Sequence, residues 1–247
     1  MIGLVTCFWV KNYGSALQSY ATQNILDKLN MENETINYSV ANEPLLRRLN
    51  IILHKLRYPS VRKAKIDKYI NKKELHKSEE YEKGVKDRIQ AFDSFIKAHI
   101  RFSEQIRDRK HLEEQSLKYS TIIVGSDQLW LPENIEEDYY TLTWVPKGIK
   151  KVSYATSFGV STIPSMIRKK TREFLMEMDG ISVRELSGVN IVKEISGKNA
   201  EIVLDPTLLL TRKEWDNIDK RNRMIEEKYI FFIMFDSPFI LGKKNRR

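Results

Sequence analysis

The sequence contains one cysteine, Cys7, and four histidines in 247 residues. A single cysteine excludes an intramolecular disulfide and a cysteine-rich metal site, and it favours a reducing, cytoplasmic location. The four histidines lie between residues 54 and 111, and none has a cysteine or acidic partner at metal-ligand spacing. We therefore expect no metal site.

Long apolar runs are missing too. The longest aliphatic and aromatic run covers residues 229–235, far short of the roughly 20 residues that a membrane-spanning helix needs. Residues 1–10 have no basic region ahead of their apolar residues. We expect neither a secretory leader nor an integral membrane protein.

Three common motifs of enzyme sites are absent. The sequence has no GxxxxGK[ST], no GxGxxG and no GxSxG. These absences argue against nucleotide hydrolysis, dinucleotide redox chemistry and serine hydrolysis. We expect no cofactor.

Positive charge is concentrated in one segment. Residues 45–101 hold 16 Lys or Arg and 7 Asp or Glu, and 16 − 7 gives the +9 of the whole chain. Three interpretations stay open: a solvated helical face, contact with an anionic membrane where lipid-linked glycans are built, or nucleic-acid binding. Nucleic acid is the least favoured, because no stacking pairs of aromatics, helix-turn-helix or zinc pattern accompany the charge.

The first half of the chain is predicted to begin with a strand, a turn, a helix and a second strand over residues 1–40. The helix shows a four-residue repeat of apolar positions that predicts its buried face: Leu17, Ala21, Ile25 and Leu29. Residues 44–118 read as basic helices, with a break at 58–60 and an amphipathic stretch at 90–100.

From residue 119 onward, strands and helices alternate. We predict strands at 119–124, 151–155, 180–184 and 201–204, and helices at 164–178 and 187–195. Strands followed by small polar residues and helices are typical of a parallel α/β sheet, whose ligands bind along the edge where the strands end. We predict a Rossmann-like domain over residues 1–210 with a basic helical insertion near 44–118.

Three polar segments follow predicted strands and supply candidate binding residues: 12–18, 124–130 and 153–159. In the first, Gly14 at a helix start lets backbone N–H groups face an anion or a sugar hydroxyl, although a tight turn with Ser15 as N-cap is an alternative. The third segment, residues 153–159, suits close approach of a ligand to the backbone. The substrate-binding candidates are Asn12, Tyr13, Gly14, Ser15, Gln18, Gly125, Ser126, Gln128, Trp130, Ser157 and Gly159.

Two further residues are candidates for catalysis. Asp127 can take a proton from a sugar hydroxyl as a general base, or accept hydrogen bonds from sugar hydroxyls. Trp130, in the same segment, is a binding candidate: it can offer its ring to a sugar face, or it can be a buried core residue.

Arg184, at a strand end, is the second candidate for catalysis. It can bind a carboxylate or phosphate, or it can pair with Glu185 or Asp205. Residues 203–207 read as the last strand and the exit to a linker.

Five segments in order resemble the polysaccharide pyruvyl transferase family: residues 12–18, 124–130, 153–159, 181–188 and 203–209. The resemblance implies a GT-B-like protein with two Rossmann-like domains facing a cleft. It implies transfer of pyruvate from phosphoenolpyruvate to hydroxyls of an exopolysaccharide or cell-wall glycan, without metal or nucleotide. On this resemblance Asp127 and Gln128 bind or activate the acceptor, Arg184 meets the donor's charge, and the backbone near Gly14 and Gly159 shapes the cleft.

One departure from the family concerns the second domain. Family members carry an Arg-Leu-His-Gly-like segment there, credited with donor binding and acid catalysis, whereas this sequence has no histidine after His111. Residues 236–247 resemble a family segment beyond that histidine. The resemblance therefore implies that residues 211–247 are a linker and a remnant of a second domain that is largely missing. The alternatives to an active transferase are an inactive or partner-dependent fragment and a basic module that binds nucleic acid or a membrane surface.

Overall fold

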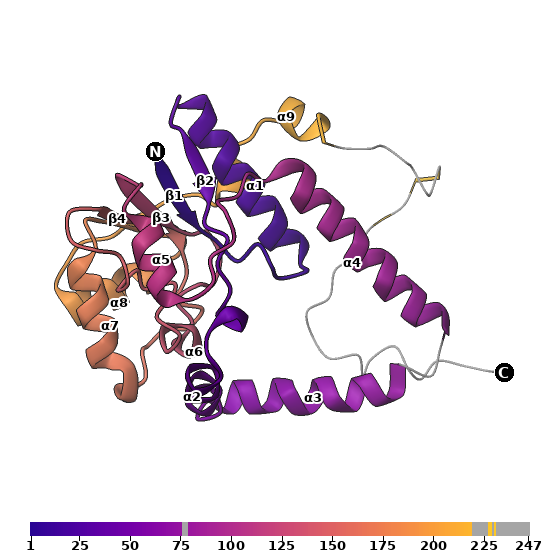
Figure 1. Ribbon diagram of the computed structural model, residues 1–247, viewed down its shortest axis with the longest axis horizontal. Coiled ribbons are helices and arrows are strands. Elements are labelled where there is room, and N and C mark those ends of the chain that lie inside the picture. The colour runs from indigo at the N-terminus through magenta and orange to yellow at the C-terminus, as the bar shows by residue number, and fades with distance from the viewer. Residues whose placement is uncertain (76–78, 219–226, 229, 231–247) are drawn as a thin grey trace. The chain divides into compact units, whose positions relative to one another are not determined.

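The computed structural model describes residues 1–75, 79–218, 227–228 and 230 (Figure 1). The chain divides into two compact units, Met1–Thr211 and Arg212–Arg247. The first unit holds every strand described here, and the second contributes helix α9 (Arg212–Asp216). The tail segment 236–247, on which the expected loss of a second domain rests, lies outside the described residues.

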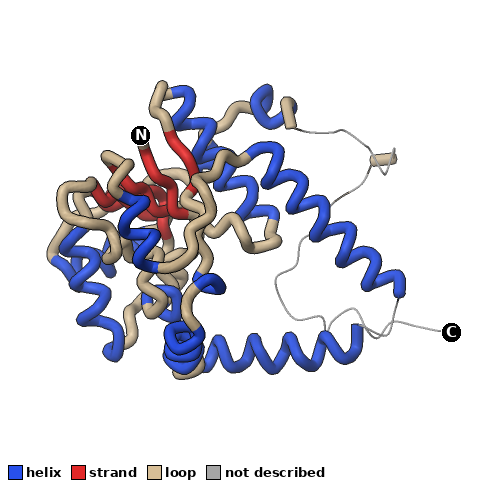
Figure 2. Tube along the Cα trace, viewed as in Figure 1, coloured by secondary structure: helices blue, strands red, loops and turns tan. Residues whose placement is uncertain are grey.

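Six parallel strands form one sheet, drawn in red in Figure 2, in the order β2-β1-β3-β4-β5-β6. Their bounds are β1 (Ile2–Val5), β2 (Asn33–Thr35), β3 (Thr121–Val124), β4 (Lys150–Thr156), β5 (Gly180–Val183) and β6 (Glu201–Ile202). This sheet confirms the predicted Rossmann-like α/β class. The chain builds outward from β1 to β2 on one side and returns to β3 on the other, so the strand order switches between β1 and β3. Open α/β sheets bind ligands at such a switch point.

The central strands are apolar because helices cover both faces of the sheet. Leu4 and Val5 of β1, and Ile122 and Val124 of β3, are all fully buried. Right-handed connections put α1 (Tyr13–Lys28) on one face. They put α5 (Arg109–Ser116), α7 (Ser165–Glu177) and α8 (Leu186–Ser196) on the other, as Figure 1 shows.

The buried face of α1 matches the predicted apolar repeat only in part. Ala21 is fully buried, whereas Leu29, directly after the helix, is 59% exposed, and the polar residues Ser19 and Gln23 are fully buried. Gln23 has partners from distant segments: its Nε2 donates to Thr35 Oγ1 (3.0 Å) and to the carbonyl of Arg101 (2.8 Å). Since buried polar groups are stable when hydrogen-bonded, the helix can bury these polar side chains beside its apolar ones.

The basic insertion between β2 and β3 is helical, as predicted. It contains η1 (Val40–Asn42), α2 (Leu45–Lys55), α3 (Pro59–Leu75) and α4 (Glu79–His99), followed by α5. The break between α2 and α3 covers residues 56–58, so it overlaps the break predicted at 58–60 only at Tyr58. Phe92 and Ile96 of α4 are buried, which confirms the amphipathic stretch at 90–100.

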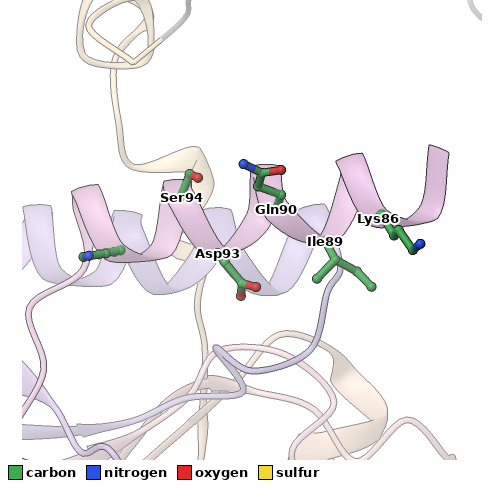
Figure 3. Close-up of a pocket in the computed structure, with 6 residues that line it drawn as sticks. Lys86, Ile89, Gln90, Asp93 and Ser94 are labelled. Atoms are coloured by element: carbon green, nitrogen blue, oxygen red, sulfur yellow. The ribbon is translucent and has the colours of Figure 1, made fainter. Parts of the chain in front are cut away.

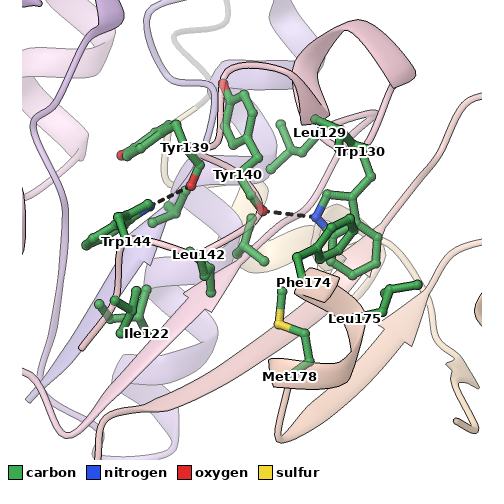
Figure 4. Close-up of a cluster of buried hydrophobic side chains, with 14 of the residues drawn as sticks. Ile122, Leu129, Trp130, Tyr139, Tyr140, Leu142, Trp144, Phe174, Leu175 and Met178 are labelled. Atoms are coloured by element: carbon green, nitrogen blue, oxygen red, sulfur yellow. Dashed lines mark hydrogen bonds between the residues drawn. The ribbon is translucent and has the colours of Figure 1, made fainter. Parts of the chain in front are cut away.

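A cluster of aromatic residues supports the loops that follow β3 and β4 (Figure 4). Trp130 Nε1 donates to the carbonyl of Tyr140 over 3.0 Å, and Trp144 Nε1 donates to the carbonyl of Tyr139 over 2.8 Å. The indole N–H groups are therefore satisfied although the rings are buried. Phe174 of α7 packs on Trp130 with ring centroids 5.2 Å apart, so the loop after β3 rests on a rigid base.

Candidate functional site

Asp127 lies at the switch point between β1 and β3, three residues after the end of β3. Its φ angle of +95° is one that residues other than glycine rarely adopt, and such strain persists only where surrounding contacts impose it. The contacts are visible at its carboxylate. Oδ2 accepts from Cys7 Sγ (3.4 Å) and Ser15 Oγ (3.1 Å), and Oδ1 accepts from the backbone N–H of Gln128 (2.8 Å).

The same carboxylate stays open to solvent, with a side chain 33% exposed. Donors from the loop after β1, from the first turn of α1 and from its own loop hold it in place. A carboxylate fixed by protein donors on one side and open on the other can accept a ligand hydroxyl at low entropic cost. This arrangement makes Asp127 the centre of the candidate site.

The backbone around Asp127 is fixed by the neighbouring loop after β4. Ser157 N donates to the carbonyl of Asp127 (2.9 Å), and Trp130 N donates to the carbonyl of Ser157 (3.1 Å). At Gly125, φ is +141° and an added Cβ would lie 1.9 Å from the carbonyl oxygen of Tyr154. Glycine is required there, because no side chain fits between the two loops.

Ser126 connects Asp127's loop to two other parts of the site. Its backbone N–H donates to Gln18 Oε1 of α1 over 3.0 Å, and its hydroxyl donates to Asp205 Oδ2 over 2.6 Å. Gln18 is buried, so its amide acts through the backbone of this loop. The sequence pattern predicts Asp205 as the exit to a linker and as one of two alternative partners of Arg184, and it gives no sign that this carboxylate holds Ser126.

Arg184, directly after β5, lies between two carboxylates. Its Nη1 is 3.0 Å from Asp205 Oδ2, and its Nη2 is 3.8 Å from Asp127 Oδ1. Arg184 therefore forms an ion pair with Asp205, one of the two partners that the sequence suggests for it. Burial alone would raise the pKa of Asp205, but hydrogen bonds from Ser126, Thr207 and Arg184 outweigh it and lower that pKa below its usual value of 3.8.

Cys7 is a hydrogen-bond donor in this site, not a nucleophile. Burial, together with the nearby charge of Asp127, raises the pKa of the thiol to about 12, so it stays protonated at neutral pH. The protonated Sγ can donate to the carboxylate of Asp127. Cys7 is not among the site residues expected from the sequence, although its place directly after the first strand was a usable signal.

A family model for polysaccharide pyruvyl transferases matches residues 12–242 of this 247-residue chain. The chain belongs to the polysaccharide pyruvyl transferase family. No curated protein and no solved structure gives a match. The matched range begins at Asn12 and includes Asp127, Arg184 and Asp205, so these three residues lie within the pyruvyl transferase region.

The predicted site residues fall into three groups. Those brought together around the central carboxylate are Ser15, Gln18, Ser126, Asp127 and Arg184. Those exposed on its rim are Asn12, Tyr13, Gly14, Gln128 and Gly159. Gly125, Trp130 and Ser157 are buried and act on the backbone or the core.

Two expectations for this family member need correction. The N-cap of α1 is Asn12, whose side chain accepts from Gly14 N over 2.8 Å, and not Ser15. Trp130 is fully buried, with Phe158 and Phe174 against its ring. The expectation that Trp130 is a sugar platform is wrong, because its ring has no free face.

Helix α4 of the insertion contacts Lys11 and the candidate residue Tyr13. Asp93 forms an ion pair with Lys11, and Arg88 Nη2 donates to the carbonyl of Lys11 over 2.8 Å. The ring of Tyr13 packs on Phe92 with centroids 5.0 Å apart. These contacts attach the insertion to the segment that leads into α1.

A hollow of about 380 Å³ on α4 is lined by residues of this one helix, from Lys86 to Lys97. Figure 3 shows Lys86, Ile89, Gln90, Asp93 and Ser94 along it. Across the described ranges, no group of three or more His, Cys, Asp and Glu could hold a metal ion. Over the same ranges, no helix is long and apolar enough to cross a membrane.

Proposed function

We propose that this chain transfers pyruvate from phosphoenolpyruvate to hydroxyls of a glycan, with Asp127 binding and activating the acceptor. The observation that carries the proposal is the Asp127 carboxylate at the β1/β3 switch point, held by Cys7 and Ser15 and open on its remaining side. Membership of the pyruvyl transferase family supports the reaction class.

The reaction balances without an added oxidant or reductant. Carbon 3 of phosphoenolpyruvate takes up a proton, a sugar oxygen bonds to carbon 2, and the bond from carbon 2 to the phosphate oxygen breaks. A second hydroxyl of the same acceptor then bonds to carbon 2, giving a pyruvate ketal and inorganic phosphate. Of the two hydroxyl protons, one balances the new methyl group and the other leaves with phosphate. Asp127 is suited to take such a proton, because a carboxylate can act as a general base.

The charge of the cluster favours an acceptor site over a donor site. Arg184 brings one positive charge, and Asp127 and Asp205 bring two negative charges, so the formal sum is −1. Phosphoenolpyruvate carries several negative charges, and a net negative cluster does not attract it. Arg184 can contact the donor with the N–H groups that Asp205 does not use, but the net negative charge means that further cations must complete the donor site.

The remaining parts of the proposal concern the acceptor and its location. We take the acceptor to be a glycan or lipid-linked saccharide of exopolysaccharide or cell-wall biosynthesis, used in the cytoplasm. The basic residues of 45–101 support contact with the membrane that carries such an acceptor.

The test uses the full chain with phosphoenolpyruvate and a panel of free and lipid-linked oligosaccharides. We expect acceptor-dependent phosphate release and, by mass spectrometry, a glycan that has gained a pyruvate ketal. Asp127→Asn should lower both signals by about 10²-fold or more, whereas Asp87→Asn on the exposed side of α4 should not. Release that requires a second, phosphoenolpyruvate-binding polypeptide would favour a partner-dependent fragment. Absence of release with every acceptor would contradict the proposal.

A further inference from the structure

Helix α2 turns its apolar side outward. Five aliphatic residues of this 11-residue helix are between 41% and 78% exposed: Leu45, Leu46, Leu49, Ile52 and Leu53. At 100° per residue they fall within one arc of about 120° of the helix surface. A helix on the surface of a globular domain normally directs such a stripe toward the core.

The polar side of α2 is the one attached to the protein. Lys55 forms an ion pair with Glu137, and His54 Nδ1 lies 3.8 Å from Glu136 Oε2. At the start of the helix, Arg47 Nε lies 3.5 Å from the buried carboxylate of Glu43. These contacts fix the rotation of α2, so its leucines stay outward.

The flanks of the apolar arc carry a single sign of charge. Residues 45–66 contain seven Lys or Arg and no Asp or Glu. Four of the seven cations, Arg48, Arg57, Lys63 and Lys65, are exposed and form no ion pair with any residue that the structure describes. A fifth, Arg62, is also exposed without such an ion pair, and its Nη1 donates to the carbonyls of Leu56 and Arg57. Figure 1 shows α3 leading away from α2 along the same side of the unit, and Ile66 adds an exposed apolar side chain to it.

We propose that α2 is a membrane-surface helix that inserts its leucine face into the headgroup region of an anionic bilayer. A helix of 11 residues is too short to span a bilayer, but an apolar arc bordered by cations is the pattern of helices that lie in the interface. The aliphatic face is buried among acyl chains, and the exposed cations contact lipid phosphates.

Other occupants fit these observations less well. Two copies of the chain joined through α2 would bring the same four cations together across a two-fold axis, which is repulsive. Nucleic acid would use the cations but leave the leucines exposed. An apolar arc bordered only by positively charged residues therefore favours an anionic lipid surface.

The experiment measures co-sedimentation of the full chain with vesicles of phosphatidylglycerol and phosphatidylcholine, and with phosphatidylcholine alone. We expect binding to the anionic vesicles and little to the neutral ones. Leu46→Glu combined with Leu53→Glu should weaken binding about tenfold or more. The matched control is Leu117→Glu, an equally exposed leucine outside α2 (67%), which should bind as the parent does.

The cations that border the apolar arc are tested separately. Arg48→Gln and Lys63→Gln should each lower the partition coefficient about fivefold and reduce its dependence on salt. Because α2's leucines are exposed, the thermal unfolding temperature of the Leu46→Glu, Leu53→Glu variant should match that of the parent. Equal binding to neutral vesicles would overturn the proposal, and so would normal vesicle binding by the Leu46→Glu, Leu53→Glu variant. The proposal would also be overturned if those two substitutions disrupted a dimer of the chain and left vesicle binding unchanged. None of these measurements needs pyruvyl transfer, so this inference and the proposed activity can fail independently.

Discussion

Arg184 donates a hydrogen bond from Nη1 to Oδ2 of Asp205 over 3.0 Å, and this pair joins the end of β5 to the segment that follows β6. The same oxygen of Asp205 accepts from Ser126 Oγ, so the loop after β3 depends on it too. One half-buried carboxylate thus connects three strand ends, and its loss should be felt both in stability and in the placement of Asp127.

Asp205→Asn should lower the free energy of unfolding at neutral pH by about 2 kcal/mol, because hydrogen bonds to a charged group are the stronger ones. The folded-state pKa of Asp205 is lowered, so its contribution is present above its ordinary pKa and is lost as pH falls through the folded value. The stability difference between parent and variant should be constant above about pH 5 and shrink below about pH 4.

Urea denaturation across that pH range measures this difference. Asp87→Asn, at an exposed position of α4, is the control and should leave the free energy of unfolding within about 0.5 kcal/mol of the parent. A difference between Asp205→Asn and the parent that stays unchanged below about pH 4 would show that the charge of Asp205 contributes nothing.

The fold and the place of the site could be predicted because both follow from local patterns. Apolar strands followed by small polar residues define parallel strands, and parallel strands bring their ends to one edge. Asp127, Arg184, Ser15 and Gln18 were expected at that edge for this reason. The observed bounds of the strands differ from the predicted ones by a few residues, since a strand ends where its pairing with the neighbouring strand ends.

The errors arose where a side chain's partner is distant in sequence. The buried side of α1 is set by Gln23, whose partner Arg101 is 78 residues away. For Trp130 both a sugar platform and a buried core residue stayed open, because the sequence does not show that the carbonyl of Tyr140 receives its N–H. Asp205 holds Ser126 across 79 residues. Periodicity reports which residues are apolar, and it cannot report which polar residues find partners.

Two loops approach each other closely at Gly125. Gly125→Ala should destabilise the fold by several kcal/mol, because the new Cβ would lie 1.9 Å from a backbone oxygen and φ is +141°. Gly84→Ala in α4, where an added Cβ meets nothing within 4 Å, should stabilise by about 0.5–1 kcal/mol. Thermal unfolding of the two variants tests the contrast, and equal effects would contradict it.

Trp130→Phe separates a core role from a sugar-binding role. The change removes the hydrogen bond to Tyr140 and leaves a small cavity, so the free energy of unfolding should fall by about 1–3 kcal/mol. The KM for the acceptor should not change, because the ring is covered by Phe158 and Phe174. A large rise in KM with unchanged stability would restore the platform interpretation.

Cys7 should resist alkylation in the native protein. With a pKa of about 12, roughly one thiol in 10,000 is ionised at pH 8, and burial hinders access further. Iodoacetamide labelling followed by mass spectrometry should be slow in buffer and fast in urea. Rapid labelling of the folded chain would show that the thiol is exposed or ionised.

Asp127 is the residue on which the proposed activity depends most directly. Asp127→Asn keeps the size of the side chain but removes its ability to take a proton, so kcat should fall by about 10²- to 10⁴-fold. Ser15→Ala removes one of the donors that hold the carboxylate and leaves the base itself, so its loss of kcat should be smaller, about tenfold. Because the amide oxygen introduced by Asp127→Asn would still accept a hydroxyl's hydrogen bond, KM for the acceptor should change little in that variant. Steady-state phosphate release, with circular dichroism to confirm folding, distinguishes these effects. If Asp127→Asn instead raised KM and left kcat intact, Asp127 would bind the acceptor without acting as its base.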